Sequence, residues 1–211
     1  MRSLIWFTML MIGVTGGAVA GGSELIRLPA PQTHGGMPLM EALKARHSSR
    51  DFSSRPLPLQ VLSDLLWAAN GVSRPESGKR TAPSAKDMRE ISVYVASVDG
   101  AYLFDPNAHT LHRVVERDIR KITGIQDFVG QAPLNLVYVS DLSRMDTNEE
   151  NKRFYSATDT GFIAQNVYLF CASAGLATVV RGSVDREALA AALGLAPHQQ
   201  IILSQTVGYP K

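Results

Sequence analysis

The stretch TDTGFIAQNVYLFCASAGLATVVRGSVD, residues 158–185, decides the fold of this 211-residue chain. Its first part, from Asp159 to Ala174, is apolar around almost the whole helical circumference, and a helix without a polar face is buried on all sides. Roughly sixteen residues are fewer than the ~20 needed to cross a bilayer, so the pattern predicts a central core helix. Gly175 is typical of the end of such a helix, because glycine readily adopts the left-handed conformation found there.

The second part of the stretch changes from helix to strand. The β-branched residues of 178–180 predict a short strand. The Gly182-Ser183 turn then leads into a new helix at Asp185. The order is therefore buried helix, strand and exposed loop, and a loop on such a rigid support is a common place for a ligand.

Composition indicates one well-packed domain, since 45% of the residues are hydrophobic. The formal net charge of +2 gives no reason to expect nucleic-acid binding. Cys171 is the single cysteine, which excludes an internal disulfide framework. It lies within the predicted core helix, where a cysteine usually behaves as a small hydrophobic residue.

The N-terminus has the pattern of a cleavable signal peptide over residues 1–20. Arg2 precedes an apolar run at 4–14, and Ala18-Val19-Ala20 is a small-residue cleavage site. The alternative is a membrane-anchoring first helix. The first interpretation predicts a periplasmic or secreted protein with no membrane attachment after cleavage. Residues 21–36 contain prolines and glycines without periodicity, which predicts a flexible lead-in.

The remaining residues, 37–211, are predicted to form a single domain. An amphipathic helix runs from Pro38 to Arg46 and a second one from Leu59 to Asn70, and residues 71–84 form a polar loop. Strands are expected at 91–98, 101–104, 110–115, 134–140, 178–180 and 200–207, and further helices at 118–123 and 186–193. Asp99-Gly100 predicts a type I′ hairpin. Since strands and helices do not alternate strictly, the fold class is α+β, with a largely antiparallel sheet flanked by helices.

The sequence RHSSR, just past the first helix, is the first candidate binding segment. In an extended chain Arg46, Ser48 and Arg50 point the same way, which places two guanidinium groups and a hydroxyl on one face. Arginine matches phosphate oxygens with paired hydrogen bonds, so a phosphate site is one interpretation. A solvated basic turn is the other.

Two further segments have the composition of a binding loop. In RTAPSAKD, the residues Pro83, Ser84 and Ala85 allow a flat ligand to approach the backbone closely, and Asp87 can accept a hydrogen bond from a ring N–H. In the segment 180–183, Gly182 allows backbone amides to face a ligand. Arg181 in the same segment either offsets negative charge on that ligand or forms a surface salt bridge.

Together these segments resemble the FMN-dependent nitroreductase family. The motifs occur in that family's order: RHSSRDF, LSDLLWAANGV, RTAPSAKDM, APLNLVYV, DTGFIAQNVYLFCASAGLATVVRGSVD and VGYP. The resemblance covers roughly residues 38–210. The segment GAYLFDPNAHTLHRV, residues 100–114, is most similar to the azoline-dehydrogenase-like (SagB-type) branch of the family.

The resemblance implies an FMN site and a homodimer whose core contains the helix from Asp159. The segment implied to hold the FMN phosphate and ribityl chain consists of Arg46, His47, Ser48 and Arg50. The segment implied to lie along the flavin consists of Pro83, Ser84, Ala85 and Asp87, where Asp87 replaces a usual asparagine. The loop implied to pack on the isoalloxazine, contributed by the partner subunit, consists of Val180, Arg181, Gly182 and Ser183. Lys211 or Arg181 would supplement the phosphate site, because a basic tail typical of many members does not follow Gly-Tyr-Pro.

The implied reaction is ping-pong hydride transfer through flavin N5 with a small-molecule or peptide-derived redox substrate. The cofactor carries this chemistry, so no catalytic side chain is required. NAD(P)H as electron donor stays open, because nicotinamide cofactors are scarce outside the cytoplasm.

Two rival functions remain. One is an exported binding or interaction domain that keeps the fold without flavin, and the other is a flavin-bound redox partner without a small-molecule substrate. Metal binding by His109 and His112 is not favoured, because residues three apart on a strand point to opposite faces. The chain has no G-x-S-x-G and no G-x-G-x-x-G motif, so serine hydrolase and Rossmann functions lack support.

Overall fold

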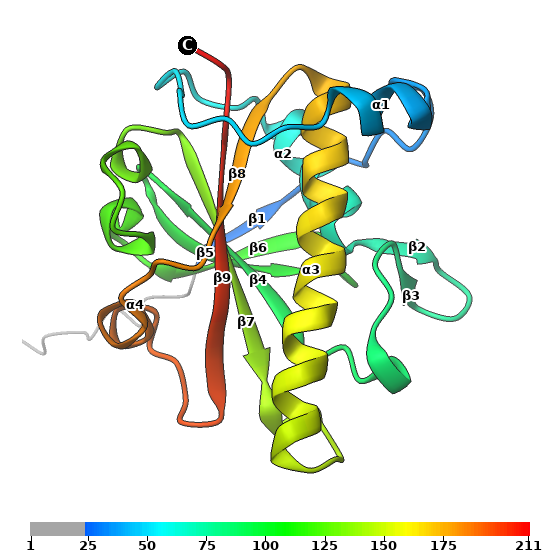
Figure 1. Ribbon diagram of the computed structural model, residues 1–211, viewed down its shortest axis with the longest axis vertical. Helices are drawn as coiled ribbons and strands as arrows, with labels where there is room; N and C mark the ends of the chain where they lie inside the picture. Colours follow the sequence, from blue (N-terminus) through cyan, green and yellow to red (C-terminus); the bar gives the residue numbers. More distant parts are fainter. Residues whose placement is uncertain (1–23) are drawn as a thin grey trace, which may run out of the picture.

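The computed structural model describes residues 24–211, and a seven-stranded sheet forms its centre (Figure 1). The strand order is β1-β6-β5-β4-β7-β9-β8, and each neighbouring pair is antiparallel. The predicted α+β class with an antiparallel sheet and flanking helices is confirmed. The signal peptide predicted for residues 1–20 lies outside the described residues.

The strands of this sheet are β1 (Leu25–Arg27), β4 (Ile91–Ser97), β5 (Gly100–Asp105), β6 (Thr110–Val115), β7 (Leu134–Asp141), β8 (Ala177–Arg181) and β9 (Gln199–Gly208). A separate two-stranded hairpin consists of β2 (Val72–Arg74) and β3 (Lys79–Arg80). The helices are α1 (Leu39–Ala45), α2 (Leu59–Asn70), α3 (Glu149–Ala174) and α4 (Arg186–Leu193). Short 3-10 turns lie at Ala85–Asp87, Arg120–Thr123, Asp127–Gly130 and Leu142–Arg144.

The two faces of the sheet are covered by different helices. Helices α2 and α3 pack on one face around Leu65, Leu136 and Val167. Helix α4 packs on the other face through Leu189, against Val137 and neighbouring side chains. Figure 1 shows α4 on the side of the sheet opposite to α3, with β9 between them.

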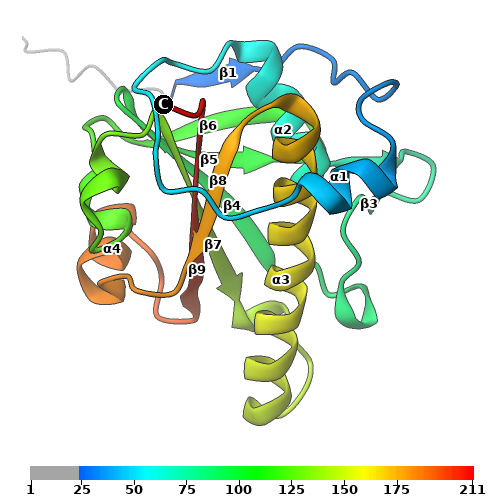
Figure 2. The same ribbon diagram turned by 45° about the horizontal axis from the view of Figure 1, so that its top comes forward.

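The central helix is longer than the sequence predicted. It begins at Glu149, where Asn148 caps it by accepting a hydrogen bond from the backbone N–H of Asn151 at 2.8 Å. The first ten residues are mostly polar, and Phe154 and Ala157 among them form no periodic apolar pattern, so the predicted start at Asp159 marked the point where the helix meets the core. Figure 2 shows that this N-terminal half projects beyond the sheet. Although α3 has 26 residues, the described part of the chain contains no helix long and apolar enough to cross a membrane.

The prediction that the central helix is buried on every side is wrong for the single chain. Ile163, Val167 and Cys171 are buried, as predicted for the core-facing side. Phe162, however, is 44% exposed and Phe154 is 62% exposed. The large apolar residues of α1 are exposed as well, among them Met40 at 75%. Helices α1 and α3 thus present an apolar surface that nothing in the described chain covers.

Several predicted helix ends are confirmed. Gly175 ends α3 and Gly194 ends α4, both in the left-handed conformation at φ of 67° and 66°. Asp185 caps α4 by accepting a hydrogen bond from the N–H of Ala188 at 3.0 Å. Cys171 is fully buried, and burial raises the pKa of its thiol well above the usual value.

Four local predictions differ from the structure. Residues 25–27 form edge strand β1, paired with β6, instead of a flexible lead-in. The predicted polar loop contains the β2–β3 hairpin. The predicted helix at 118–123 is a single 3-10 turn. The turn between β4 and β5 is closed by the Ser97–Gly100 pair, so Val98 and Asp99 are its central residues, and neither has the positive φ of a type I′ turn.

The cap at Asn148 gives a direct test of how α3 begins. Replacing it with alanine (Asn148→Ala) leaves the N–H of Asn151 without its acceptor and should lower the free energy of unfolding by about 1 kcal/mol. Urea unfolding followed by circular dichroism measures this. Asn107→Ala, at an exposed turn residue whose side chain makes no hydrogen bond in the structure, is the control and should change stability little. Equal stability of the two variants would contradict the assigned helix start.

Candidate functional site

The first predicted segment crosses the C-terminal end of α3. Arg46 leaves α1 in an extended conformation, with φ of −57° and ψ of 120°. The backbone N–H of Ser49 donates to the carbonyl of Thr178 on β8 at 3.0 Å, so the segment lies against β8. The guanidinium of Arg46 lies 5.3 Å from the centre of the Tyr168 ring on α3. His47 is exposed, and its Nδ1 lies 2.9 Å from the carbonyl oxygen of Ala45.

Tyr168 joins the first predicted segment to the third. Its hydroxyl shares a hydrogen bond with Ser48 at 2.9 Å and accepts the backbone N–H of Val180 at 2.9 Å. Ser48 and the start of the 180–183 loop are therefore neighbours within one chain. The resemblance implies that a partner subunit contributes this loop to the flavin site, and within one chain the loop lies beside Ser48.

The rest of the 180–183 loop is accessible. Gly182 and Ser183 are exposed, and a Cβ added at Gly182 would meet no atom closer than 3.8 Å. The carbonyl of Ser183 accepts the N–H of Ile125 at 3.3 Å. The backbone of Gly182 is thus free to approach a ligand, as predicted.

Arg181 points into the protein interior. The side chain is 5% exposed, and its three nitrogens donate to Thr206 Oγ1 at 3.1 Å, the carbonyl of Thr123 at 2.7 Å and Asn135 Oδ1 at 2.9 Å. Burial lowers the pKa of the guanidinium to about 10, so it stays charged at neutral pH. The alternative of a surface salt bridge is wrong. A role opposite the negative charge of a ligand stays a prediction, since the guanidinium already has three acceptors.

The second predicted segment lies elsewhere, beside the middle of α3. The backbone N–H of Ala85 donates to Asp159 Oδ2 at 2.8 Å. Lys86, Asp87 and Arg89 all have positive φ, between 51° and 56°. Such a conformation costs energy in residues other than glycine, and it clusters at functional sites.

Asp87 is already engaged by a neighbour. Arg89 donates to both of its carboxylate oxygens, at 2.8 and 2.6 Å, and these bonds lower the pKa of the Asp87 carboxyl. A ligand N–H would have to share this carboxylate with Arg89. Ser84 is also occupied: its hydroxyl donates to Glu90 Oε2 at 3.2 Å and accepts the N–H of Arg89 at 2.8 Å.

A buried pair of carboxyl groups supports this segment, and the sequence analysis did not find it. Glu90 is fully buried and Asp159 is 2% exposed. Burial raises the pKa of the Glu90 carboxyl, and the nearby Asp159 raises it further. Burial and the neighbouring carboxyl group thus both favour the neutral form of Glu90. An acid inside an apolar helix was the one feature of the sequence that pointed to Asp159.

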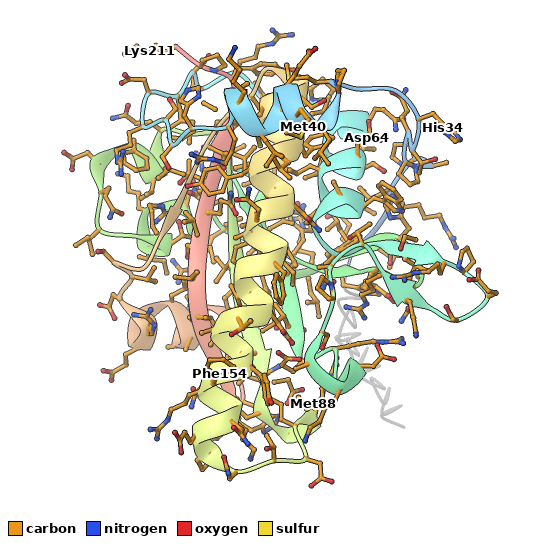
Figure 3. The ribbon with its side chains drawn as sticks, turned by 45° about the vertical axis from the view of Figure 1, so that its right-hand side comes forward. His34, Met40, Asp64, Met88, Phe154 and Lys211 are labelled. Carbon is orange, nitrogen blue, oxygen red and sulfur yellow. The ribbon has the colours of Figure 1, made fainter. Side chains whose placement is uncertain are left out.

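The predicted segments thus form two groups in one chain. Segments 46–50 and 180–183 meet at Tyr168, whereas segment 83–87 meets α3 at Asp159. Nine residues of helix separate these two contact points, or about 13 Å along the axis. Figure 3 shows Met88 beside the N-terminal half of α3, and Met40 of α1 near the other end. Lys211 lines a different cavity, of about 820 Å³, together with Phe52 and Ser53 just past the 46–50 segment.

The chain is similar to known proteins in both sequence and fold. The model of the Nitroreductase family matches residues 43–209. This chain belongs to the nitroreductase family. Its sequence is 33% identical over 156 residues to the candidate nitroreductase MJ1384 of Methanocaldococcus jannaschii, a match covering 69% of this chain and 78% of that protein.

Solved structures show the same fold. A candidate nitroreductase from Ralstonia eutropha JMP134 superposes with a TM-score of 0.86 at 47% identity, over 92% of this chain and 93% of that one. The NADPH:FMN oxidoreductase of Vibrio harveyi, complexed with NAD+, superposes with a TM-score of 0.62 at 19% identity, over 82% of this chain and 69% of that one. The second similarity is one of fold alone.

The residues of segment 46–50 have chemistry that fits the phosphate end of FMN. Arg46 and Arg50 form no ion pair with any carboxylate among the described residues, so both guanidinium groups are available to an anion. Residues 24–211 contain no cluster of histidine, cysteine or acidic side chains that could hold a metal ion. His109 and His112 contact the hydroxyls of Ser63 and Thr110 instead.

The raised pKa of Glu90 makes stability depend on pH. The contribution of Glu90 to the free energy of unfolding is fully present below the ordinary glutamate pKa of 4.5. It is lost as the pH rises through the higher pKa of the folded state. Glu90→Gln is neutral at every pH, so the free energy of unfolding of the wild type relative to this variant should fall from about pH 4.5 upward. Urea unfolding across the range to about pH 8 measures the difference. Identical pH profiles would show that Glu90 has an ordinary pKa in the folded protein.

Proposed function

We propose that this nitroreductase-family protein is an FMN-dependent oxidoreductase. The observation that supports it best is the cluster at Tyr168, where Ser48, Arg46 and the N–H of Val180 come together beside the open loop at Gly182. Arg46 in this cluster and the nearby Arg50 form no ion pair with a carboxylate of the described residues, and the backbone of the loop is accessible. Such a combination suits a ligand with a phosphate at one end and a flat ring at the other.

The chemistry of the protein itself is binding and orientation. Arg46 and Arg50 would hold the phosphate, Ser48 would donate to the ribityl chain, and the 180–183 loop would pack on the ring. When bound, FMN supplies hydride transfer. Arg181 ties the base of the loop to β7 and β9 through Asn135 and Thr206, which keeps the loop backbone in one position.

A homodimer would complete this site. The apolar surface of α1 and α3, with Met40 and Phe162 exposed, is of the kind that marks a protein interface. Segment 83–87 lies about 13 Å along α3 from the Tyr168 cluster within one chain. A second copy packed on α3 would bring its own 83–87 segment toward that cluster, so in this arrangement the partner supplies the 83–87 segment.

The substrate is proposed to be a small molecule or a peptide-derived azoline. The hairpin of β5 and β6, residues 100–114, carries the resemblance to the azoline-dehydrogenase-like branch. Steady-state turnover with nitroaromatics, quinones and azoline peptides, each with and without NAD(P)H, identifies the substrate class and the donor. A flavin-bound protein that turns over none of them would instead be a redox partner.

Removal of the two free arginines tests the cofactor assignment. The double variant Arg46→Ala, Arg50→Ala loses the predicted charge-assisted hydrogen bonds to phosphate, and FMN should bind about 100-fold or more weakly. Titration of flavin fluorescence measures the affinity. Arg117→Ala, at an exposed arginine outside these segments, is the control and should bind FMN like the wild type. Unchanged affinity in the double variant would refute the phosphate assignment.

One observation favours a second function, a binding domain that has lost flavin. Asp87 stands where the family usually has asparagine, and Arg89 occupies both of its oxygens. The visible spectrum of the purified protein separates the two proposals. The oxidoreductase should be yellow and lose its colour on reduction, whereas a colourless protein that refuses added FMN supports the binding domain.

Export is a separate proposal, based on the pattern of residues 1–20. The protein produced by secreting cells should begin at Gly21, and intact-mass measurement of the extracellular or periplasmic fraction checks this. A full-length chain starting at Met1 in the cytoplasmic fraction would contradict cleavage.

A further inference from the structure

A cavity of about 220 Å³ lies between the β2–β3 hairpin, the 83–89 segment and α3. Arg74, Lys79, Arg80 and Arg89 contribute cationic side chains to its lining. Figure 1 shows the hairpin beside α3, on the side away from α4. The proposed flavin chemistry makes no use of these four cations.

Arg80 is a half-buried cation of this cavity without a charged partner among the described residues. Its side chain is half-buried, its Nε is inaccessible to water without any hydrogen-bond partner, and no carboxylate among the described residues pairs with it. Burial lowers the pKa of its guanidinium, and the like charges of Arg89 and Arg144 lower it further. A partly desolvated cation beside other cations is unfavourable unless an anion joins it.

The other three cationic side chains of the cavity differ in whether a carboxylate neutralises their charge. Arg89 is neutralised by Asp87, with a shortest contact of 2.6 Å. Arg74 donates to the backbone carbonyl of Arg80 at 2.7 Å, which leaves its charge uncompensated. Lys79 is exposed and forms no ion pair in the described chain.

The acidic floor of the cavity does not cancel these charges. Glu90 and Asp159 both line the cavity and are buried. Burial raises the pKa of the Glu90 carboxyl, which favours its neutral form. The lining contains four cationic side chains against the three carboxyl groups of Asp87, Glu90 and Asp159, so it is positive overall.

We propose that this cavity binds a compact anionic group, a carboxylate or phosphate of a small molecule, with Arg80 as its main partner. The planar guanidinium suits paired hydrogen bonds to either group. The volume is below the ~300 Å³ of a typical ligand pocket, so it accepts the acidic end of a molecule rather than a whole cofactor. If segment 83–87 lies along the flavin, which rests on the proposed function, the acidic end belongs to the redox substrate. The anion site itself requires no flavin.

The test uses malonate and inorganic phosphate as probes in isothermal titration calorimetry at constant ionic strength. Both probes are titrated into the Arg46→Ala, Arg50→Ala double variant, which removes the predicted FMN phosphate site. This background should still bind at least one probe. Adding Arg80→Gln should weaken that binding about 10- to 100-fold, the loss expected for a hydrogen bond to a charged group. Adding Arg117→Gln is the matched control and should leave binding unchanged.

Two outcomes would overturn the proposal: neither probe binds the double variant, or Arg80→Gln and Arg117→Gln bind alike. Lys79→Gln, at an exposed position, is a second variant in case Arg80→Gln disturbs the fold, and it should weaken the same probe. The backbone pairing of Arg80 with Val72 does not involve the substituted side chain. FMN affinity depends on Arg46 and Arg50, so failure of the proposed function and failure of this anion site give different results.

Discussion

The packing of α3 against the sheet is the constraint on which the rest of the structure depends. Val167 and Cys171 on its inner side have no exposed surface. Burial of such side chains is the main favourable term in folding, at about 25 cal/mol per Å² of apolar surface. Because the helix is fixed by this packing, Tyr168 and Asp159 are fixed with it. Tyr168 then holds the 46–50 and 180–183 segments, and Asp159 holds the 83–87 segment through the N–H of Ala85.

Buried charges determine how each segment is held. Arg181 is enclosed without a carboxylate and is satisfied by neutral acceptors from Thr123, Asn135 and Thr206. Glu90 and Asp159 are enclosed near each other, and burial raises the pKa of the Glu90 carboxyl. Leaving a buried polar group unpaired costs more than a typical hydrogen bond contributes. Both arrangements therefore favour one backbone conformation for the segments next to them.

The two groups of segments are complementary in chemistry. The Tyr168 cluster offers free cations and open backbone, whereas the 83–89 segment offers strained backbone at Lys86, Asp87 and Arg89. The exposed apolar surface of α1 and α3, which includes Met40 and Phe162, is the natural place for a second copy in the proposed dimer. In the proposed dimer the anion-binding cavity at Arg80 would lie next to the flavin. The Tyr168 cluster would then position the cofactor, and the cavity would position the acidic end of the substrate.

The sequence by itself determined the fold class, the confirmed helix ends at Asn70, Gly175 and Gly194, and the membership of the family, because these follow from local periodicity, capping residues and ordered motifs. It missed the first ten residues of α3 because polar helix positions carry no apolar pattern, and it missed β1 because an edge strand of three residues is specified by pairing with β6. Only the tertiary structure decided that Arg181 points inward, that Tyr168 joins Ser48 to Val180, and that Glu90 meets Asp159. Tyr168 is 120 positions from Ser48 and 12 positions from Val180 in the sequence, and the inward position of Arg181 depends on the direction of its side chain. Contacts of that kind arise from how the helix packs on the sheet, which no local pattern encodes.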